Sequence, residues 1–183
     1  MANQKDLFVN ASLQCGIVTD TTVKSLSGTE DSAGARETIR VRVKITGPDG
    51  SVSYAKPDSE ADATNTVVPD GVVFCGRIQT LRAKFSGLNC TVSPTGALTC
   101  ASPEELQRIL KTLNANAFNF VAPNLVSSVH TIEVQARTSA NTSPLGVTRS
   151  LGNANAFIGA GSVGVEVVRM LKGNDGTTLV GIQ

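Results

Sequence analysis

The sequence predicts a mainly β protein, an antiparallel β-sandwich or jelly roll with one inserted α-helix. Three observations predict it: apolar and polar residues alternate with a period of two, turn sequences separate these segments, and one segment has helical spacing instead. The chain has 183 residues, the length of one domain, so we expect a single β-sandwich domain over residues 1–183.

The clearest strand covers residues 39–45, where four β-branched residues alternate with three cations. Such alternation is typical of a strand with one buried and one solvated face, as in an antiparallel sheet. Residues 79–85 and 130–137 show the same pattern. Four further segments are weaker strand candidates: residues 16–24, 72–75, 117–121 and 154–158. Turn sequences lie between strands at residues 47–50, 69–71 and 174–176.

One segment has the signals of a helix. Ser102 is a typical N-cap, Pro103 suits the first helical position and Glu105 suits the third. Apolar residues then recur every three or four positions, at Leu106, Ile109, Leu110 and Leu113. This pattern predicts an α-helix over about residues 103–114.

Composition argues against two classes of partner. The chain has 16 Lys and Arg against 15 Asp and Glu, so it lacks the basic excess of a nucleic-acid-binding protein. No apolar run reaches the roughly 18 residues that a membrane-spanning helix needs. With one Tyr, no Trp and six Phe, the chain is also poor in the aromatic rings that stack on sugars and bases. We therefore expect neither a nucleic-acid partner nor a membrane span.

The cysteines form an even set of four: Cys15, Cys75, Cys90 and Cys100. Cys90 and Cys100 flank two short β-type runs around a Pro-Thr-Gly turn, so a hairpin would bring them together, and a disulfide there would contribute about 2–4 kcal/mol. A zinc site is disfavoured because no CxxC pair exists and His130, which we interpret as structural, is the single histidine. Buried free thiols are the alternative. A disulfide would indicate an oxidising compartment, extracellular or at the cell surface.

One segment matches the glycine pattern of a dinucleotide-binding motif, but the surrounding sequence does not match that fold. Residues 159–164 read GxGxxG, which in a dinucleotide-binding fold lies beneath a pyrophosphate. Here 19 residues follow Gly164, and no acidic residue stands about 20 positions on to hold a ribose. We therefore interpret the motif as a turn before a strand over residues 163–171, and we expect no cofactor.

The sequence contains one candidate metal site and no catalytic motif. Asp58, Glu60 and Asp62 place three carboxylates at alternate positions, which could gather round a calcium ion; a solvated acidic loop is the alternative. Neither GxSxG nor HExxH occurs, so we predict no catalytic residues and no enzymatic activity. An enzyme that uses scattered carboxylates stays as a third hypothesis, because such chemistry leaves no short motif.

The N-terminal segment is apolar and poor in charge. Leu7, Val9, Ala11 and Leu13 share one parity, and Phe8 breaks it. We expect this strand, with Leu7, Phe8 and Val9 as its assembly residues, to contact a neighbouring subunit by adding to the edge of its sheet. Pairing of residues 1–13 within their own domain is the alternative.

Residues 130–137, HTIEVQAR, and residues 161–170, GSVGVEVVRM, resemble the last core strands of bacterial and phage jelly-roll heads. Those heads are similar to the tumour-necrosis-factor and complement-head-like family. The resemblance covers the C-terminal third of the chain. It implies a non-enzymatic, oligomeric head, often trimeric, that binds a ligand or builds a structure.

Together these observations predict a non-enzymatic, self-associating structural subunit of an extracellular or surface assembly, such as a filament or an appendage. The alternative is a carbohydrate- or receptor-binding jelly-roll head that forms trimers. The expected partner is a second copy of the chain, with a glycan or a surface receptor as a further partner.

Overall fold

The protein consists of antiparallel β-strands in a computed structural model, which describes residues 4–25, 30–57, 71–84, 90–100, 104–144, 151–172 and 178–181. The strands are β1 (Gln4–Ser25), β2 (Glu30–Thr46), β3 (Val52–Tyr54), β4 (Val72–Lys84), β5 (Cys90–Val92), β6 (Leu98–Cys100), β7 (Glu104–Val126), β8 (Thr131–Pro144), β9 (Leu151–Lys172) and β10 (Thr178–Gly181). All strands predicted from alternation lie within these elements, except that His130 immediately precedes β8 and Phe85 is outside the described residues.

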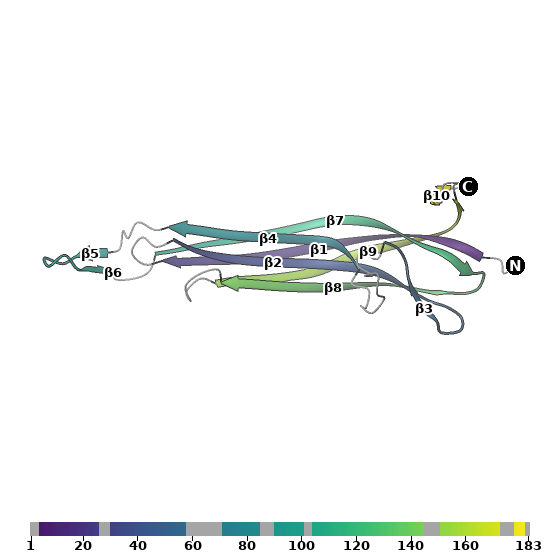
Figure 1. Cartoon of the computed structure of the whole chain (residues 1–183), viewed down its shortest axis with the longest axis horizontal. Coiled ribbons are helices and arrows are strands. Elements are labelled where there is room, and N and C mark those ends of the chain that lie inside the picture. Colours follow the sequence, from purple (N-terminus) through teal and green to yellow (C-terminus); the bar gives the residue numbers. More distant parts are fainter. Residues whose placement is uncertain are drawn as a thin grey trace.

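The molecule is elongated because three of its strands are unusually long. β1, β7 and β9 have 22, 23 and 22 residues, which at about 3.3 Å per residue corresponds to roughly 70 Å. Figure 1 shows the hairpin β5–β6 at one end of the molecule and the start of β1, together with β10, at the other.

Two antiparallel sheets form the body of the molecule. The first has the strand order β10-β9-β1-β7. In the second, β2 is the central strand, and it pairs with β8 along one side and with β4 and then β3 along the other. A third, two-stranded sheet is the hairpin β5–β6. The two large sheets lie face to face in a sandwich-like arrangement (Figure 1).

The core lies between the two sheets and follows from the alternation in the sequence. In β2, Ile39, Val41, Val43 and Ile45 are at most 1% exposed, whereas Arg40, Arg42 and Lys44 point to the other face. Phe120 of β7 and Val9 of β1 belong to the same core and pack into it from the opposite sheet. The half of the sandwich nearer the start of β1 is therefore apolar.

The other half of the interior contains buried polar side chains beside a small apolar cluster of Val23, Ala33 and Leu81. Gln79 of β4 accepts a hydrogen bond from the Thr19 hydroxyl (2.5 Å) and donates to the Thr21 hydroxyl (2.6 Å) and to the Arg108 carbonyl oxygen (3.0 Å). Thr19 and Thr21 are fully buried and Gln79 is 5% exposed. These bonds join β1, β4 and β7, so this half of the molecule is held by hydrogen bonds across the sandwich as well as by packing.

The predicted helix over residues 103–114 is wrong, because its described part belongs to strand β7. β7 pairs with β1 along nearly its whole length, from Glu104 opposite Ser25 to Val126 opposite Gln4. The helically spaced apolar residues divide between the two faces of this strand. Leu106 and Leu110 lie on the inner face of the sheet, beside Val23 and Thr19 of β1. Ile109 and Leu113 lie on its outer face.

The turn predicted at residues 159–164 is also wrong. These residues lie in the middle of β9, which continues without interruption from Leu151 to Lys172 and is followed by no helix in the described chain. Gly159 and Gly161 lie at a register shift opposite β1, between Leu13 and Cys15, which is a β-bulge, whereas Gly164 pairs regularly with Asn10. The segment therefore has strand geometry, and the described backbone offers no helix N-terminus there for a pyrophosphate.

Candidate assembly surface

The N-terminal segment with the predicted assembly residues lies in the centre of the first sheet. Leu7 pairs with Ala122 of β7 on one side and with Val167 of β9 on the other. Leu7 and Val9 are buried in the core, and Phe8 is half-buried on the outer face. This corrects the expected addition of Leu7, Phe8 and Val9 to a neighbouring sheet edge, because both sides of the strand are already paired. The alternative, pairing within its own domain, is the arrangement observed.

The edges of the sheets differ in how well charge protects them. Natural proteins block edge strands with charged residues and proline, because an open edge pairs with other chains. Three of the four long edges carry such residues: Glu104, Glu105, Arg108, Lys111 and Pro123 in β7, Glu133, Arg137 and Pro144 in β8, and Arg77, Arg82 and Lys84 in β4. Over residues 151–168 the edge of β9 carries Glu166 as its single charged residue and no proline. The edge of β9 is therefore the least protected.

That edge is open over a defined window. β9 pairs with β1 over residues 151–168, and β10 pairs with β9 only over residues 169–172. Within the described chain, no other strand pairs with β9. All residues from 157 to 167 are exposed. On the N-terminal side of residue 161, the bulge opposite Gln14 interrupts the regular pairing of β9 with β1. The regular part of the open edge therefore covers residues 161–168.

Three valines of this window face the interior side of the sandwich but remain uncovered. By register, Val163, Val165 and Val167 lie beside Ala11, Val9 and Leu7, all of which are buried. The three valines are nevertheless 48%, 44% and 65% exposed. The second sheet therefore covers β1 in this region and leaves the inner face of β9 open.

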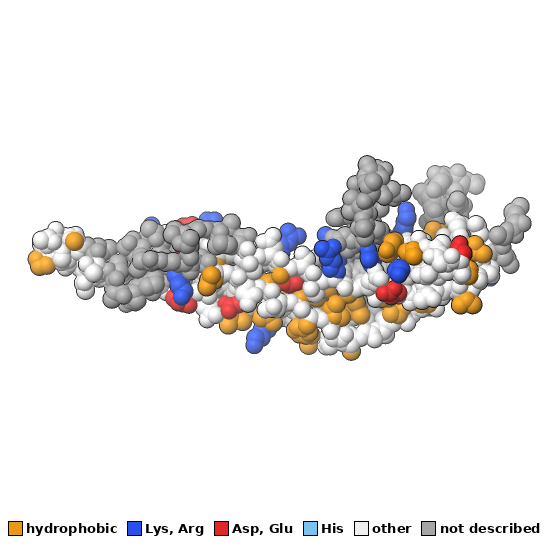
Figure 2. Space-filling model, turned by 90° about the horizontal axis from the view of Figure 1, so that it is seen from below, with side chains coloured by type: hydrophobic (Ala, Val, Ile, Leu, Met, Phe, Trp, Pro, Cys, Tyr) orange, Lys and Arg blue, Asp and Glu red, His pale blue; other side chains and the backbone are white. Residues whose placement is uncertain are grey.

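A groove lies beside these valines, at the end of the sandwich. It has a volume of about 490 Å³ and is lined mainly by apolar side chains: Leu7, Leu125, Val126, Ile132, Val165 and Val167. Lys5, Ser127, Ser128 and His130 supply its polar lining. Figure 2, which views the molecule from below, shows hydrophobic side chains exposed along the half that contains the start of β1.

His130 is part of the wall of this groove. Its Nε2 lies 2.8 Å from the carbonyl oxygen of Val126, and its Nδ1 is buried without a hydrogen-bond partner among the described residues. His130 immediately precedes β8, as expected for a structural histidine at a strand start. The contact with Val126 closes the connection between β7 and β8.

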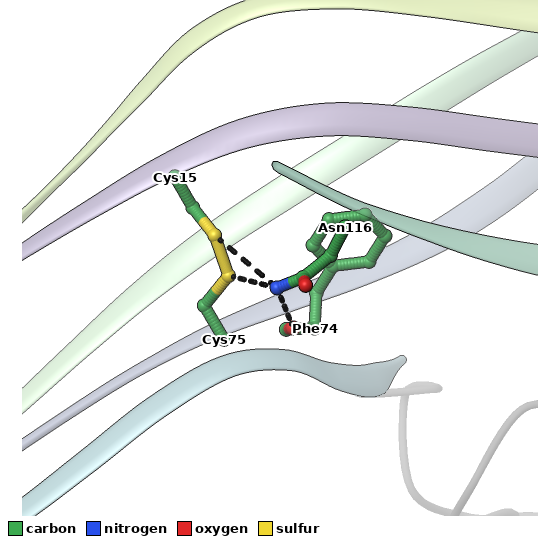
Figure 3. The surroundings of a disulfide bond; sticks show 4 residues. All are labelled: Cys15, Phe74, Cys75 and Asn116. Atoms are coloured by element: carbon green, nitrogen blue, oxygen red, sulfur yellow. Dashed lines mark hydrogen bonds between the residues drawn. A yellow bond between two sulfur atoms is a disulfide. The ribbon is translucent and has the colours of Figure 1, made fainter. Parts of the chain in front are cut away.

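A disulfide joins the two sheets between Cys15 of β1 and Cys75 of β4, with 6.7 Å between their Cα atoms. Figure 3 shows Asn116 of β7 beside this bond. The Asn116 amide donates to the Cys75 sulfur (2.9 Å) and to the carbonyl oxygen of Phe74 (3.1 Å). Cys15 and Cys75, which the sequence did not predict as a pair, therefore link the sheets covalently, and Asn116 connects β7 to this link.

The pairing of the other two cysteines stays a prediction. The backbone of the hairpin places Cys90 of β5 directly opposite Cys100 of β6, as the sequence predicts. Cys90 is disulfide-bonded. The side chain of Cys100 lies outside the described residues.

The outer face of the second sheet is basic. Arg36 and Arg40 of β2 and Arg137 of β8 line a hollow of about 230 Å³, together with the polar side chains of Thr38, Ser139 and Asn141. The Arg40 guanidinium also donates to the carbonyl oxygen of Gly71 (3.0 Å). Guanidinium and hydroxyl groups in one hollow suit a ligand that carries oxygen acceptors.

Two acidic residues of β2 are buried, Asp31 and Glu37, and the second has an unsatisfied carboxylate oxygen. Glu37 of β2 is 1% exposed, and its Oε2 has no hydrogen-bond partner among the described groups. Burial raises the pKa of Glu37 above its ordinary value of 4.5, and hydrogen bonds from the backbone of Thr38 and Ser139 offset part of that rise. Glu37 is thus a buried carboxyl whose charge opposes folding.

The remaining predicted site cannot be placed. The calcium candidates Asp58, Glu60 and Asp62 lie outside the described residues. In the part of the chain that the structure describes, no three His, Cys, Asp or Glu side chains gather as a metal site, and no helix is long and apolar enough to span a membrane.

Comparisons of the chain with protein-family models, with curated proteins and with solved structures found no match in any of the three. The function is therefore inferred from the geometry of the chain itself.

Proposed function

We propose that this chain is a non-enzymatic structural subunit that associates with copies of itself in an extracellular or surface assembly, such as a filament or an appendage. The observation that carries the proposal is the open edge of β9 beside the exposed Val163, Val165 and Val167. An edge with a single charged residue, next to uncovered apolar side chains, is a surface suited to pairing with another chain.

The outer face of the same sheet adds further apolar surface. Leu113 of β7 and Phe157 of β9 lie on either side of Gly16 of β1 and are 55% and 51% exposed. Ile109 and Leu151 on the same face are 51% and 64% exposed. Large exposed apolar patches are typical of surfaces that other protein chains cover.

The disulfide and the shape support the proposed setting. A disulfide between the two sheets persists in an oxidising environment, which is why we place the assembly outside the cell or on its surface. Strands about 70 Å long give the molecule an elongated body, which suits a subunit of an extended assembly. The sandwich-like body is compatible with a jelly-roll topology, which we retain as part of the proposal.

The second candidate is a carbohydrate- or receptor-binding jelly-roll head. The arginine-lined hollow on the outer face of β2 and β8 favours it, because its hydroxyl, amide and guanidinium groups can hydrogen-bond to a polar ligand. A binding head and a structural subunit differ in how they assemble, since a head closes at a fixed number of copies.

The distinguishing experiment measures molar mass by light scattering behind size exclusion, over a hundredfold range of concentration. A structural subunit of a growing assembly gives a mass that continues to rise with concentration, and electron microscopy then shows extended particles. A mass that stops at three copies supports the trimeric head. A chain that stays a monomer over the whole range contradicts both.

A further inference from the structure

Val163 and Val167, in the open window of β9, are placed symmetrically about Val165. Residues 162–168 read Ser-Val-Gly-Val-Glu-Val-Val, with Val165 at the centre and a valine two positions away on each side. The three valines face the inner side of the sandwich, and Ser162, Gly164, Glu166 and Val168 face the outer side. A strand of this kind can pair with a second copy of itself in the antiparallel direction without any change of sequence.

In the symmetric register, Val165 lies opposite Val165 of the second copy and Val163 lies opposite Val167. Cross-strand valine pairs on one face are favourable, because their side chains contact each other directly. Glu166 then lies opposite Gly164, so the acidic side chains of the two copies avoid each other, and like charges directly opposite would be unfavourable. In this register the valines therefore contact each other, and the two glutamates do not lie opposite one another.

The neighbouring structure restricts pairing to this window. On one side, β10 occupies the ladder of β9 over residues 169–172. On the other side, the bulge opposite Gln14 breaks the regular spacing of the strand. In the symmetric register residue 161 would lie opposite residue 169, which already pairs with β10, so the seven residues from 162 to 168 remain and their centre is Val165.

We propose that two copies of this chain pair through the open edges of β9, antiparallel, about a two-fold axis that passes beside Val165. This inference rests on the proposed function and names the partner and the register of one contact. The first sheets of the two copies become one continuous sheet, and the exposed valines of both form a single apolar strip. Val165 and Val167 also line the groove, so the second copy extends its apolar wall. A two-fold contact closes after two copies, so growth beyond the dimer needs a second contact elsewhere on the chain.

Cysteine cross-linking tests the register. Directly opposed residues of antiparallel strands have Cα atoms about 4.5–5.5 Å apart, within the range of a disulfide. No described cysteine is free in the native chain. Val165→Cys should therefore give a covalent dimer after mild oxidation, seen on a non-reducing gel.

Two matched variants supply the control. Val163 of one copy lies four residues from Val163 of the other, about 13 Å along the strand, so Val163→Cys should not cross-link with itself. The same holds for Val167→Cys. A mixture of the two variants should cross-link, because residues 163 and 167 are opposite each other. Self-linking of Val163→Cys as efficient as that of Val165→Cys would overturn the register.

A charge variant tests the contact itself. Val165→Lys places a cation on the open edge and should reduce the mass measured by light scattering, whereas Val92→Lys at the distant hairpin, where Val92 is 67% exposed, should leave it unchanged. Circular dichroism verifies that both variants remain folded. If the wild-type chain associates and Val165→Lys associates equally, the β9 contact is rejected and the proposed function survives. If the wild-type chain is monomeric at every concentration, the proposed function fails as well.

Discussion

Gly152 of β9 packs against the backbone of Gly34 in β2, so closely that a Cβ atom on Gly152 would overlap the Gly34 carbonyl oxygen. This contact joins the two sheets at the end of the sandwich opposite the groove. The sheets are thus in direct backbone contact at one end and leave an open groove at the other.

We predict that Gly152→Ala destabilises the protein by about 1–3 kcal/mol, because the added methyl group forces the sheets apart. Urea unfolding followed by circular dichroism measures the free energy of unfolding. Gly76→Ala is the matched control, since a Cβ there meets Val73 at an ordinary distance of 3.6 Å. Equal stability of Gly152→Ala and the wild type would show that the packing of the two sheets does not require the close contact between Gly152 and Gly34.

We predict that replacing Cys15 and Cys75 together by alanine costs about 4 kcal/mol, because the bond closes a loop of 60 residues in the unfolded chain. Cys90→Ala with Cys100→Ala should leave the main unfolding transition in place, since the hairpin forms a separate two-stranded sheet. Alkylation before reduction, followed by intact-mass analysis, counts the free thiols. Two alkylated cysteines in the hairpin would reject the predicted Cys90–Cys100 bond.

We predict that Glu37→Gln stabilises the protein at neutral pH. Burial raises the folded-state pKa of Glu37, so the folded protein binds this proton more tightly than the unfolded chain does. The contribution of Glu37 to stability is therefore greatest below its unfolded pKa and is lost as pH rises through the folded pKa. Stability curves of the wild type and Glu37→Gln should converge near pH 4 and separate toward pH 8.

Glu133→Gln is the control for this pH dependence, because a hydrogen bond from Gln135 lowers the pKa of Glu133. Any contribution of Glu133 has the opposite sign and is lost as pH falls. If Glu37→Gln and the wild type show the same difference at pH 4 and pH 8, Glu37 does not titrate between those values in the folded protein.

We predict that Val9→Ala destabilises the protein by about 2 kcal/mol, because Val9 is fully buried between the two sheets. Val73→Ala should change stability by less than about 0.5 kcal/mol, since Val73 is 52% exposed. Thermal and urea unfolding give the comparison. A tolerated Val9→Ala would contradict the central position of β1.

The strands of the second sheet could be predicted because their signal is local. Residues 39–45 alternate so regularly that the buried and solvated faces follow directly from the sequence. The helix prediction failed because Leu106, Ile109, Leu110 and Leu113 satisfy a helical period, while their partner strand β1 lies more than 80 residues earlier. Pairing with β1 along the whole of β7 outweighs a weak local preference for helix.

The central position of β1 could not be predicted for a related reason. Alternation at Leu7, Val9 and Ala11 indicates one buried face, and an edge strand and a central strand share that signal. An edge strand has one neighbouring strand and a central strand has two, and both neighbours of β1 come from residues 104–168. The open edge of β9 has one readable sign, the scarcity of charge over residues 151–168, but the sequence alone does not show which strands are edges.

The placement of β1 has a consequence for how the chain folds. β1 needs two partners, and both of them, β7 and β9, come more than 75 residues later in the chain, so they are synthesised well after β1. Until residue 168 has emerged, the apolar face of β1 lacks its two neighbours. Contacts between such distant segments form slowly, and an unpaired apolar strand can aggregate while it waits. There is therefore a long interval during synthesis in which a chaperone that holds β1 would raise the yield of folded protein.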